Sequence, residues 1–186
     1  MEYLDLFDQT GQLIGSPVAR EELGDRSQLG DAFVKVVHGI PVNSAGAVLV
    51  QQRALTKAIW PGRWALLGGH VDAGETAEAS LLREFREEYG IDASTAPRAM
   101  VLRLIQRVAH ALMEFWLILI DVDVADVVCQ ADEVAQVGYR TPAELVEIYQ
   151  AEDRWAPGEA VYRDQVLELF RSLPEVSQAL RAEVAR

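Results

Sequence analysis

The sequence predicts one layered domain of the α/β or α+β class, in which strands precede and surround one central helix. Two observations favour this class. Short segments rich in valine, isoleucine and leucine are separated by turns that contain glycine, asparagine or proline. In the middle of the chain, one segment instead repeats apolar residues at helical spacing. The length of 186 residues suits a single domain with a full hydrophobic core. We expect it to consist of an N-terminal hairpin and loop (residues 1–30), a core (31–150) and a helical tail (151–186).

The chain begins with a predicted β-hairpin. Residues 3–7 alternate in the direction of their side chains, and residues 12–15 resume the strand after an Asp-Gln-Thr-Gly turn. Residues 17–30 are polar and contain two glycines, so we expect a loop that leads into the core.

The core opens with three predicted strands. Residues 33–42 are rich in valine and isoleucine, residues 43–46 form a turn, and residues 47–53 return. Residues 64–67 are a further short strand, which ends at the glycine pair Gly68-Gly69.

A helix is predicted to follow, between Thr76 and Gly90. Threonine is a good N-cap, and glycine is favoured directly after the last helical turn. The apolar residues at helical spacing are Ala79, Leu82, Phe85 and Tyr89.

The rest of the chain predicts two more strands, a third short one, and several helices. A threonine-proline step favours the start of a helix, and Pro157-Gly158 separates the helical tail from the core. The predicted elements are strands at residues 99–108, 112–124 and 134–139, a helix that begins at Thr141-Pro142, and helices at residues 158–171 and 174–185.

Composition limits the classes of function. The chain has 17 Lys and Arg against 29 Asp and Glu, a net charge of −12, which argues against binding a nucleic acid polymer. It does not argue against a small phosphorylated ligand, because bound cations invert the local charge. The most apolar stretch, residues 115–120, is too short to cross a membrane. The single cysteine, Cys129, excludes an internal disulfide, and the first residues lack the pattern of a signal peptide, so we expect a cytoplasmic protein.

Three glutamates in the predicted helix carry the strongest chemical signal. Glu84, Glu87 and Glu88 are spaced so that a helix places them on one face. Crowded carboxylates repel each other unless a cation neutralises them, and hard divalent cations prefer oxygen ligands. Arg83 lies beside Glu84 and one turn before Glu87, where it can hold a carboxylate in place. This face predicts a Mg²⁺ or Mn²⁺ site with room for a phosphorylated ligand; the alternative is a solvated acidic surface.

The wider spacing favours the metal site. The segment from Gly69 to Ile91 resembles the Nudix box, Gly-x5-Glu-x7-Arg-Glu-U-x-Glu-Glu-x-Gly-U, where U is a bulky apolar residue. Phe85 stands at the first U position, where an aliphatic residue is usual. The residues in register are Gly69, Glu75, Arg83, Glu84, Glu87, Glu88, Gly90 and Ile91.

The resemblance implies a fold and a set of roles. The expected fold is an α/β/α sandwich with a central mixed sheet, in which the box forms a loop, a helix and a second loop. The resemblance implies that Glu84, Glu87 and Glu88 bind the metal, together with the carbonyl of Gly69. Arg83 would orient Glu84. The chemistry implied is the attack of a metal-activated water on a diphosphate phosphorus.

Other site residues are less determined by the sequence. Members of the family differ in their general base: some use a box glutamate and others a residue of a later loop, where the candidates are Asp132 and Glu133. The alternative for both is an exposed acidic loop. Arg53 and Lys57 are candidate phosphate contacts, or else surface charges.

Two residues of the box loops complete the candidate list. We count His70 as a substrate contact or, alternatively, a loop histidine. Glu75 is placed with the substrate-binding residues and is expected to pair with Arg83. Other histidines and tryptophans are expected to be structural. We expect His38 and His110 in strands with satisfied hydrogen bonds, and Trp60 and Trp64 in the core, with stacking on a base as the alternative for the tryptophans.

Residues 1–150 resemble the branch of the family that contains isopentenyl diphosphate isomerase and its hydrolase relatives. An isomerase needs a cysteine directly before Gly-His, where this chain has Gly68, and a histidine-rich metal site for which only His38 is nearby. We therefore expect hydrolysis of a nucleoside di- or triphosphate or another nucleoside-diphosphate derivative. The alternatives are an isomerase and a non-catalytic nucleotide sensor. A small diphosphate-containing substrate is the expected partner, and the resemblance allows a homodimer.

Overall fold

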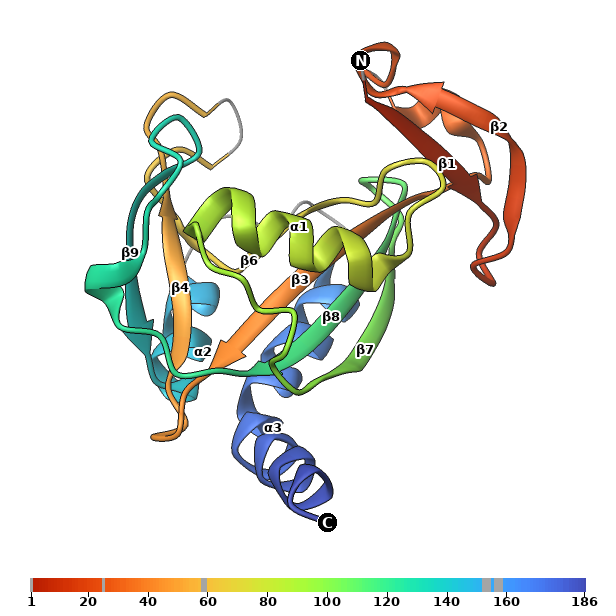
Figure 1. Ribbon diagram of the computed structural model, residues 1–186. Helices are drawn as coiled ribbons and strands as arrows, with labels where there is room; N and C mark the ends of the chain where they lie inside the picture. Colours follow the sequence, from red (N-terminus) through yellow and green to blue (C-terminus); the bar gives the residue numbers. More distant parts are fainter. Residues whose placement is uncertain (1, 25, 58–59, 152–154, 156–158) are drawn as a thin grey trace.

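A mixed sheet of seven strands lies at the centre of the computed structural model, which describes residues 2–24, 26–57, 60–151, 155 and 159–186 (Figure 1). The strand order is β5-β4-β3-β8-β7, with β6 paired to β3 and β9 paired to β4. β3 and β8 are parallel, and the other pairs are antiparallel. The strands are β3 (Val34–Val42), β4 (Val48–Arg53), β5 (Trp64–Ala65), β6 (Leu67–His70), β7 (Arg98–Gln106), β8 (Ala111–Leu119) and β9 (Val134–Arg140).

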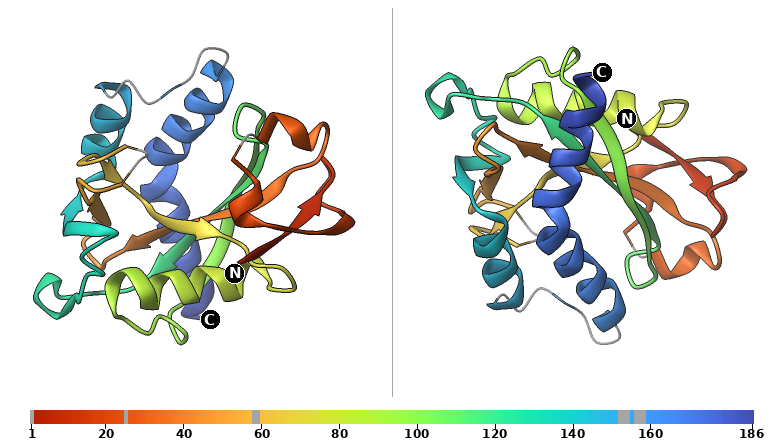
Figure 2. Two further views of the ribbon diagram at one scale, coloured as in Figure 1. Left: turned by 90° about the horizontal axis from the view of Figure 1, so that it is seen from above. Right: turned by 90° about the horizontal axis from the view of Figure 1, so that it is seen from below.

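Helices cover both faces of this sheet. α1 (Ala77–Tyr89) lies on one face, whereas α2 (Pro142–Ala151) and α3 (Ala160–Val184) lie on the other, as the view from above in Figure 2 shows. Leu81, Phe85 and Tyr89 pack from α1 into an apolar cluster. α2 and α3 cover a second, larger cluster. The predicted α/β/α sandwich with a mixed sheet is confirmed.

The N-terminal hairpin forms a separate two-stranded antiparallel sheet from β1 (Tyr3–Phe7) and β2 (Leu13–Ala19), at one side of the molecule (Figure 1). Backbone bridges from Phe7 to Phe33 and from Leu4 to Asp72 join it to the core. The prediction of a loop over residues 17–30 is partly wrong. β2 extends to Ala19, and two short 3-10 helices follow, η1 (Arg20–Glu22) and η2 (Arg26–Leu29).

The ends of α1 confirm the sequence prediction. Thr76 Oγ1 accepts a hydrogen bond from the Ala79 N–H at 3.1 Å, and the N–H of Gly90 donates to the carbonyl of Arg86 at 2.9 Å. Gly90 has the left-handed backbone conformation, with φ of 67°. Both helix ends are therefore fixed by local contacts, which sets the orientation of the glutamate row between them.

β3 changes its neighbour along its length, and this divergence creates the space for the candidate site. Its first half pairs with β6 through Val36–His70 to Gly39–Leu67, but β4 pairs with it only at Val42–Val48. β4 thus separates from β3, and β6 takes its place beside β3. Groups from both strands face the same helix across this gap.

The predicted pair of C-terminal helices is wrong. α3 runs without interruption through Pro174. Proline removes one helical hydrogen bond, but Phe170, Leu173 and Ser177 on both sides of it are buried against the sheet. Tertiary packing therefore keeps the helix continuous. Pro157 and Gly158 lie outside the described residues.

Two strand boundaries also differ from prediction. The strand expected to end at residue 124 stops at Leu119, and a 3-10 helix, η3 (Val124–Asp126), follows it. The strand expected at residues 64–67 is divided into β5 and β6, so Gly68 and Gly69 belong to a strand. Among the described helices, none combines the length and the apolar character needed to span a membrane.

Candidate active site

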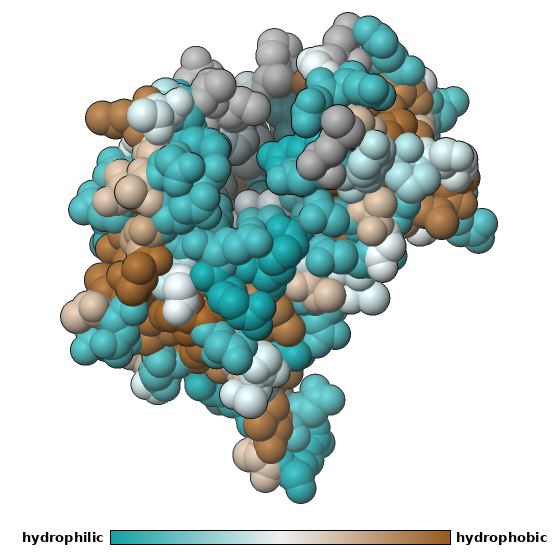
Figure 3. Space-filling model, turned by 45° about the horizontal axis from the view of Figure 1, so that its top comes forward, coloured by the Kyte–Doolittle hydropathy of each residue, from teal (hydrophilic) through white to brown (hydrophobic). Residues whose placement is uncertain are grey.

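Arg83 contacts two members of the acidic row of α1, which consists of Glu84, Glu87 and Glu88. Its Nη1 donates to Glu84 Oε1 at 3.0 Å and to Glu87 Oε2 at 3.2 Å. Figure 3 shows hydrophilic side chains gathered over the middle of this face, where α1 lies, with a hollow above them. The side chain of Glu87 is half-exposed, whereas that of Glu84 is largely buried. Burial raises the pKa of Glu84, although Arg83 opposes this shift.

The other side of the Arg83 guanidinium holds the loop before the helix. Nη2 donates to the carbonyl of His70 at 3.1 Å and to Glu75 Oε2 at 3.3 Å, and it lies 3.6 Å from Asp72 Oδ2. The buried hydroxyl of Ser80 also donates to Glu75. The expected pair between Glu75 and Arg83 is therefore present. One arginine fixes the loop, β6 and the helix relative to each other.

Glu84 packs directly on Gly69. A Cβ atom at position 69 would lie 2.0 Å from Glu84 Oε1 and 2.3 Å from its carboxyl carbon. Only a residue without a side chain allows the carboxylate to approach β6 this closely. The carboxylate and the backbone of the box glycine are thus neighbours, as a shared metal site requires.

Glu88 is the most buried of the three glutamates, with a relative exposure of 5%. Its Oε2 accepts from Gln51 Nε2 at 3.1 Å and from the N–H of Gly68 at 3.4 Å. Burial, and then the neighbouring Glu84, raise the pKa of Glu88 to about 8. Both donors are neutral, so they satisfy the oxygen geometrically without compensating a negative charge.

These carboxylates suit a hard divalent cation, although the chain alone does not enclose one. Within the described residues, no three carboxylate, histidine or cysteine side chains converge closely enough to surround a metal ion. Mg²⁺ normally uses one or two carboxylates with waters and substrate phosphates, and Mn²⁺ prefers the same ligand types. The buried Glu88 and the Glu84 carboxylate on Gly69 fit that requirement.

His70 ends β6 beside the box. Its Nε2 lies 2.6 Å from Arg26 Nη2, and its ring is largely shielded from solvent. Burial, and then the charges of Arg26 and Arg20, lower the pKa of His70 to about 3, so the ring is neutral at physiological pH. This histidine is therefore part of the site region but not an exposed loop residue.

Arg53 and Lys57, the residues expected to contact phosphate, lie at the end of β4 and in the loop after it. Lys57 Nζ is 2.5 Å from Glu133 Oε1, and the Ala54 N–H donates to the carbonyl of Glu133 at 2.9 Å. Arg53, at the end of β4, pairs with Val134 in β9. These contacts bring the loop after β4 and the loop before β9 together. The charge of Glu133 also raises the pKa of Glu88, after burial and Glu84, whereas the two hydrogen bonds lower it.

Position 68 has no space for the cysteine of an isomerase. A Cβ atom there would lie 2.3 Å from the carbonyl oxygen of Val37 and 2.8 Å from His38 Nδ1. Contacts this short with backbone require the strand to move. Burial, and then Glu88, raise the pKa of the Cys129 thiol, which disfavours the reactive thiolate.

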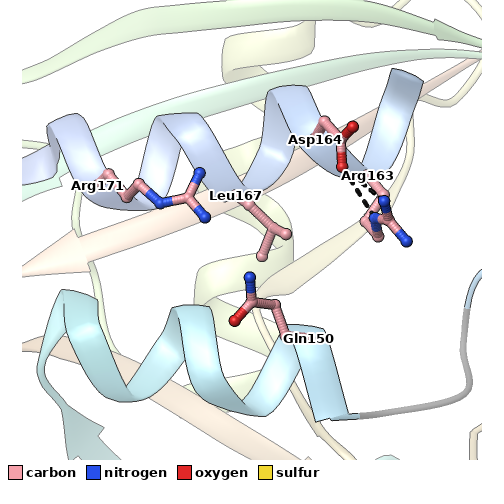
Figure 4. A pocket seen from close by; sticks show the side chains of 5 residues that line it. All are labelled: Gln150, Arg163, Asp164, Leu167 and Arg171. Atoms are coloured by element: carbon pink, nitrogen blue, oxygen red, sulfur yellow. Dashed lines mark hydrogen bonds and ion pairs between the residues drawn. The ribbon is translucent and has the colours of Figure 1, made fainter. Parts of the chain in front are cut away.

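A cavity of about 480 Å³ lies elsewhere, between α2 and α3 (Figure 4). None of its lining residues belongs to the box or to the strands beneath it. We therefore separate it from the candidate active site. It is lined by Gln150, Arg163, Asp164, Leu167 and Arg171.

The structural expectations for other aromatic residues have mixed outcomes. His38 lies in β3 and stacks on Phe115, with ring centroids 5.0 Å apart. His110 was expected in a strand, but it lies in the turn before β8 with φ of 44°. Trp64 packs on the core and under Arg140, as expected. Trp60 is 37% exposed, so the expectation of core packing is wrong for it.

Sequence reasoning missed several side chains in direct contact with the box, among them Gln51 and Arg26. Gln51 donates to Glu88, and Arg26 contacts His70. Gln51 is 1% exposed, a rare state for glutamine unless it has a buried partner. The only signal in the sequence is the position of Gln51, which directly follows the apolar run of residues 48–50 in the same strand.

Comparisons with known proteins agree with this geometry. A family model described as NUDIX domain matches residues 32–165. An uncharacterised Nudix hydrolase of Listeria monocytogenes is 31% identical over 147 residues, which cover 78% of this chain and 83% of the relative. The chain belongs to the Nudix family of hydrolases. Nucleoside triphosphatase NudI of Escherichia coli is 45% identical over 49 residues, 26% of this chain and 35% of that protein.

Solved structures show the same fold. The crystal structure of DR0079 from Deinococcus radiodurans has a TM-score of 0.70 at 22% identity and covers 92% of this chain and 99% of that one. The NUDIX domain of Shewanella oneidensis NrtR, in complex with ADP ribose, has a TM-score of 0.53 at 16% identity, with 83% and 98% covered. At these identities the likeness concerns the fold alone.

Proposed function

We propose that the chain is a Mg²⁺- or Mn²⁺-dependent hydrolase of a diphosphate linkage in a nucleoside di- or triphosphate or another nucleoside-diphosphate derivative. The observation that carries the proposal is the surroundings of Glu88. This buried carboxylate has neutral donors only among the described residues, and it lies beside the largely buried Glu84. Two desolvated carboxylates are unfavourable as anions, and a divalent cation compensates both charges.

Each proposed role follows from position. Glu84, Glu87, Glu88 and the carbonyl of Gly69 hold the metal, and Arg83 positions the first two carboxylates. When bound, the cation lowers the pKa of a water and neutralises charge on the phosphoryl oxygens. The water oxygen forms a bond to phosphorus while the bridging P–O bond breaks.

The proton of the attacking water passes to a carboxylate. A box glutamate and Glu133 are the two candidates. The contact with Lys57 holds the side chain of Glu133 in place in the loop before β9. The cationic side chains of Lys57 and Arg53 contact phosphoryl oxygens, and His70 and Glu75 are the other substrate-binding residues. The functional base is the residue whose neutral variant loses the acidic limb of the pH profile, where protonation of the base lowers the rate.

The nucleotide as substrate class is supported by one named match. A relative that is 45% identical over 49 residues is a nucleoside triphosphatase. The net charge of −12 favours a small substrate over a nucleic acid polymer. The cytoplasmic location and the homodimer stay predictions.

A substrate panel tests the proposal. Nucleoside di- and triphosphates, dinucleotide polyphosphates, nucleotide sugars, nucleotide cofactors and isopentenyl diphosphate are incubated with Mg²⁺ or Mn²⁺. We expect cleavage of one nucleotide class by the wild type and at least about a 100-fold loss in Glu87→Gln. Glu78→Gln is the matched control, because Glu78 lies on the same helix and pairs with Arg98 outside the acidic row.

The panel also separates the alternatives. Rearrangement of isopentenyl diphosphate without hydrolysis would establish the isomerase. Nucleotide binding without turnover, unchanged in Glu87→Gln, would establish the sensor. An equal loss in the Glu78 and Glu87 variants would contradict the assigned role of the row.

A further inference from the structure

β1 of the N-terminal hairpin runs beside the box loop, residues 71–75, which joins β6 to α1. On one side of this loop, the N–H of Val71 donates to the carbonyl of Lys35 in β3 at 3.0 Å. On the other side, the N–H of Ala73 donates to the carbonyl of Tyr3 in β1 at 2.7 Å. The box loop is therefore held between a strand of the core sheet and the hairpin.

The hairpin also contacts a type II turn in the box loop, at residues 72–75. The N–H of Glu75 donates to the carbonyl of Asp72 at 3.0 Å, and the third residue, Gly74, has a φ of 80°, as this turn requires. Asp5 Oδ2 accepts from the N–H of Gly74 at 2.8 Å. In a type I turn the central peptide is reversed, so its carbonyl would face this carboxylate. The side chain of Asp5 therefore stabilises the type II conformation.

The turn places the carboxylates of its first and last residues on Arg83. Asp72 Oδ2 lies 3.6 Å from Arg83 Nη2, and Glu75 Oε2 accepts from the same nitrogen at 3.3 Å. The other nitrogen, Nη1, donates to Glu84 and Glu87. A change in the conformation of the turn therefore reaches the guanidinium that two of the proposed metal ligands share.

We propose that Asp5 is a positioning residue for the metal site, which acts through the turn at Gly74 and through Arg83. The inference rests on the proposed function, since it concerns the same acidic row. Asp5 lies outside residues 32–165, the segment that the family model matches. In this chain the geometry of the box thus depends on a hairpin that precedes the matched segment.

Affinity for Mn²⁺ in the absence of substrate tests this role. We expect Asp5→Ala to weaken Mn²⁺ binding about tenfold, because the groups that orient metal ligands lose their support. Asp5→Asn should recover most of the affinity, since its amide oxygen still accepts from the N–H of Gly74. The matched control is Asp8→Ala. Asp8 accepts from Thr10 and Gln12 at the tip of the same hairpin, so its loss should leave Mn²⁺ affinity unchanged.

Hydrogen exchange of the Gly74 amide gives a second readout that does not involve the metal. Asp5→Ala should accelerate this exchange about fivefold or more, because one hydrogen bond is lost, whereas Asp8→Ala should not change it. If Asp5→Ala does not fold, Asp5→Glu takes its place. The added methylene keeps the charge but displaces the carboxylate, so we expect both weaker Mn²⁺ binding and faster exchange at Gly74.

Three results would overturn the positioning role: unchanged Mn²⁺ affinity in the Asp5 variant, an equal loss of affinity in Asp8→Ala, or exchange at Gly74 that does not respond to the loss of Asp5. None of them depends on turnover. Absence of hydrolysis across the substrate panel would overturn the proposed function, while weaker Mn²⁺ binding in Asp5→Ala but not in Asp8→Ala would still support the positioning of the metal site by the hairpin.

Discussion

The two sides of the acidic row hold their carboxylates in opposite ways. On the side of Arg83, Glu84 and Glu87 share one guanidinium, and Glu87 is half-exposed. On the side of β4 and β6, Glu88 is buried and meets the neutral donors Gln51 and Gly68. The first side is compensated by the chain itself. The second is not, so we expect it to depend more strongly on a bound cation.

Among the variants that test this difference, Glu88→Gln should have the largest effect on turnover and on stability. Turnover should fall at least about 100-fold, because a proposed metal ligand is lost. In EDTA, the melting temperature should instead rise by roughly 5 °C, since a buried charge is replaced by a neutral amide. Kinetics and calorimetry measure the two effects.

The sign of the pH dependence follows from the direction of the shift. The pKa of Glu88 is raised to about 8 in the folded protein from 4.5. The folded state therefore binds the proton more tightly, and metal-free stability decreases as pH rises from about 4.5 to about 8. The advantage of Glu88→Gln should grow over that interval. A stability gain equal at pH 5 and pH 8 would contradict the buried charge, and Glu87→Gln should give little gain at either pH.

Gln51→Leu should have an intermediate effect. It removes the 3.1 Å hydrogen bond that orients Glu88, and loss of such a supporting contact typically weakens metal affinity about tenfold or more. Titration with Mn²⁺ measures the change. Gln136→Leu serves as the control, because Gln136 is exposed and contacts Gln52 rather than a glutamate. Equal affinities in the two variants would leave Gln51 without a positioning role.

Ser80→Ala, on the side of Arg83, should have the smallest effect on stability and turnover. The buried Ser80 hydroxyl contacts Glu75, which in turn contacts Arg83. Loss of one hydrogen bond costs about 1 kcal/mol, and the melting temperature should fall by about 2–4 °C. Turnover should change less than about tenfold, because Arg83 keeps its other partners. A loss as large as that of Glu88→Gln would show that the two sides do not differ.

Local features of the site were predictable from the sequence. The helix ends at Thr76 and Gly90 and the spacing of the three glutamates depend on residues a few positions apart. The pair between Arg83 and Glu75, which lies in the loop before the helix, was expected from the family resemblance. The helix ends and the glutamate spacing follow from local backbone geometry, so the order of residues contains the necessary information.

Contacts between distant segments were not predictable. Gln51 and Glu88 are 37 positions apart, and Arg26 and His70 are 44 apart. Their meeting depends on the divergence of β4 from β3, where β6 takes its place, and on the placement of the N-terminal segment. Pro174 failed as a helix boundary for a related reason, because burial of its neighbours outweighs the missing hydrogen bond. The local preference of proline to end a helix is therefore outweighed where packing against the sheet stabilises the helix.

The contact between Gly69 and the Glu84 carboxylate has a consequence for how this chain can vary. Every other amino acid carries a Cβ atom, which would lie 2.0 Å from Glu84 Oε1. No single-nucleotide change of a glycine codon leads to a residue that avoids this overlap. Because the overlapping atoms are the far end of the Glu84 side chain, substitution at position 69 is expected to displace this carboxylate and so to disturb the proposed metal site rather than the backbone.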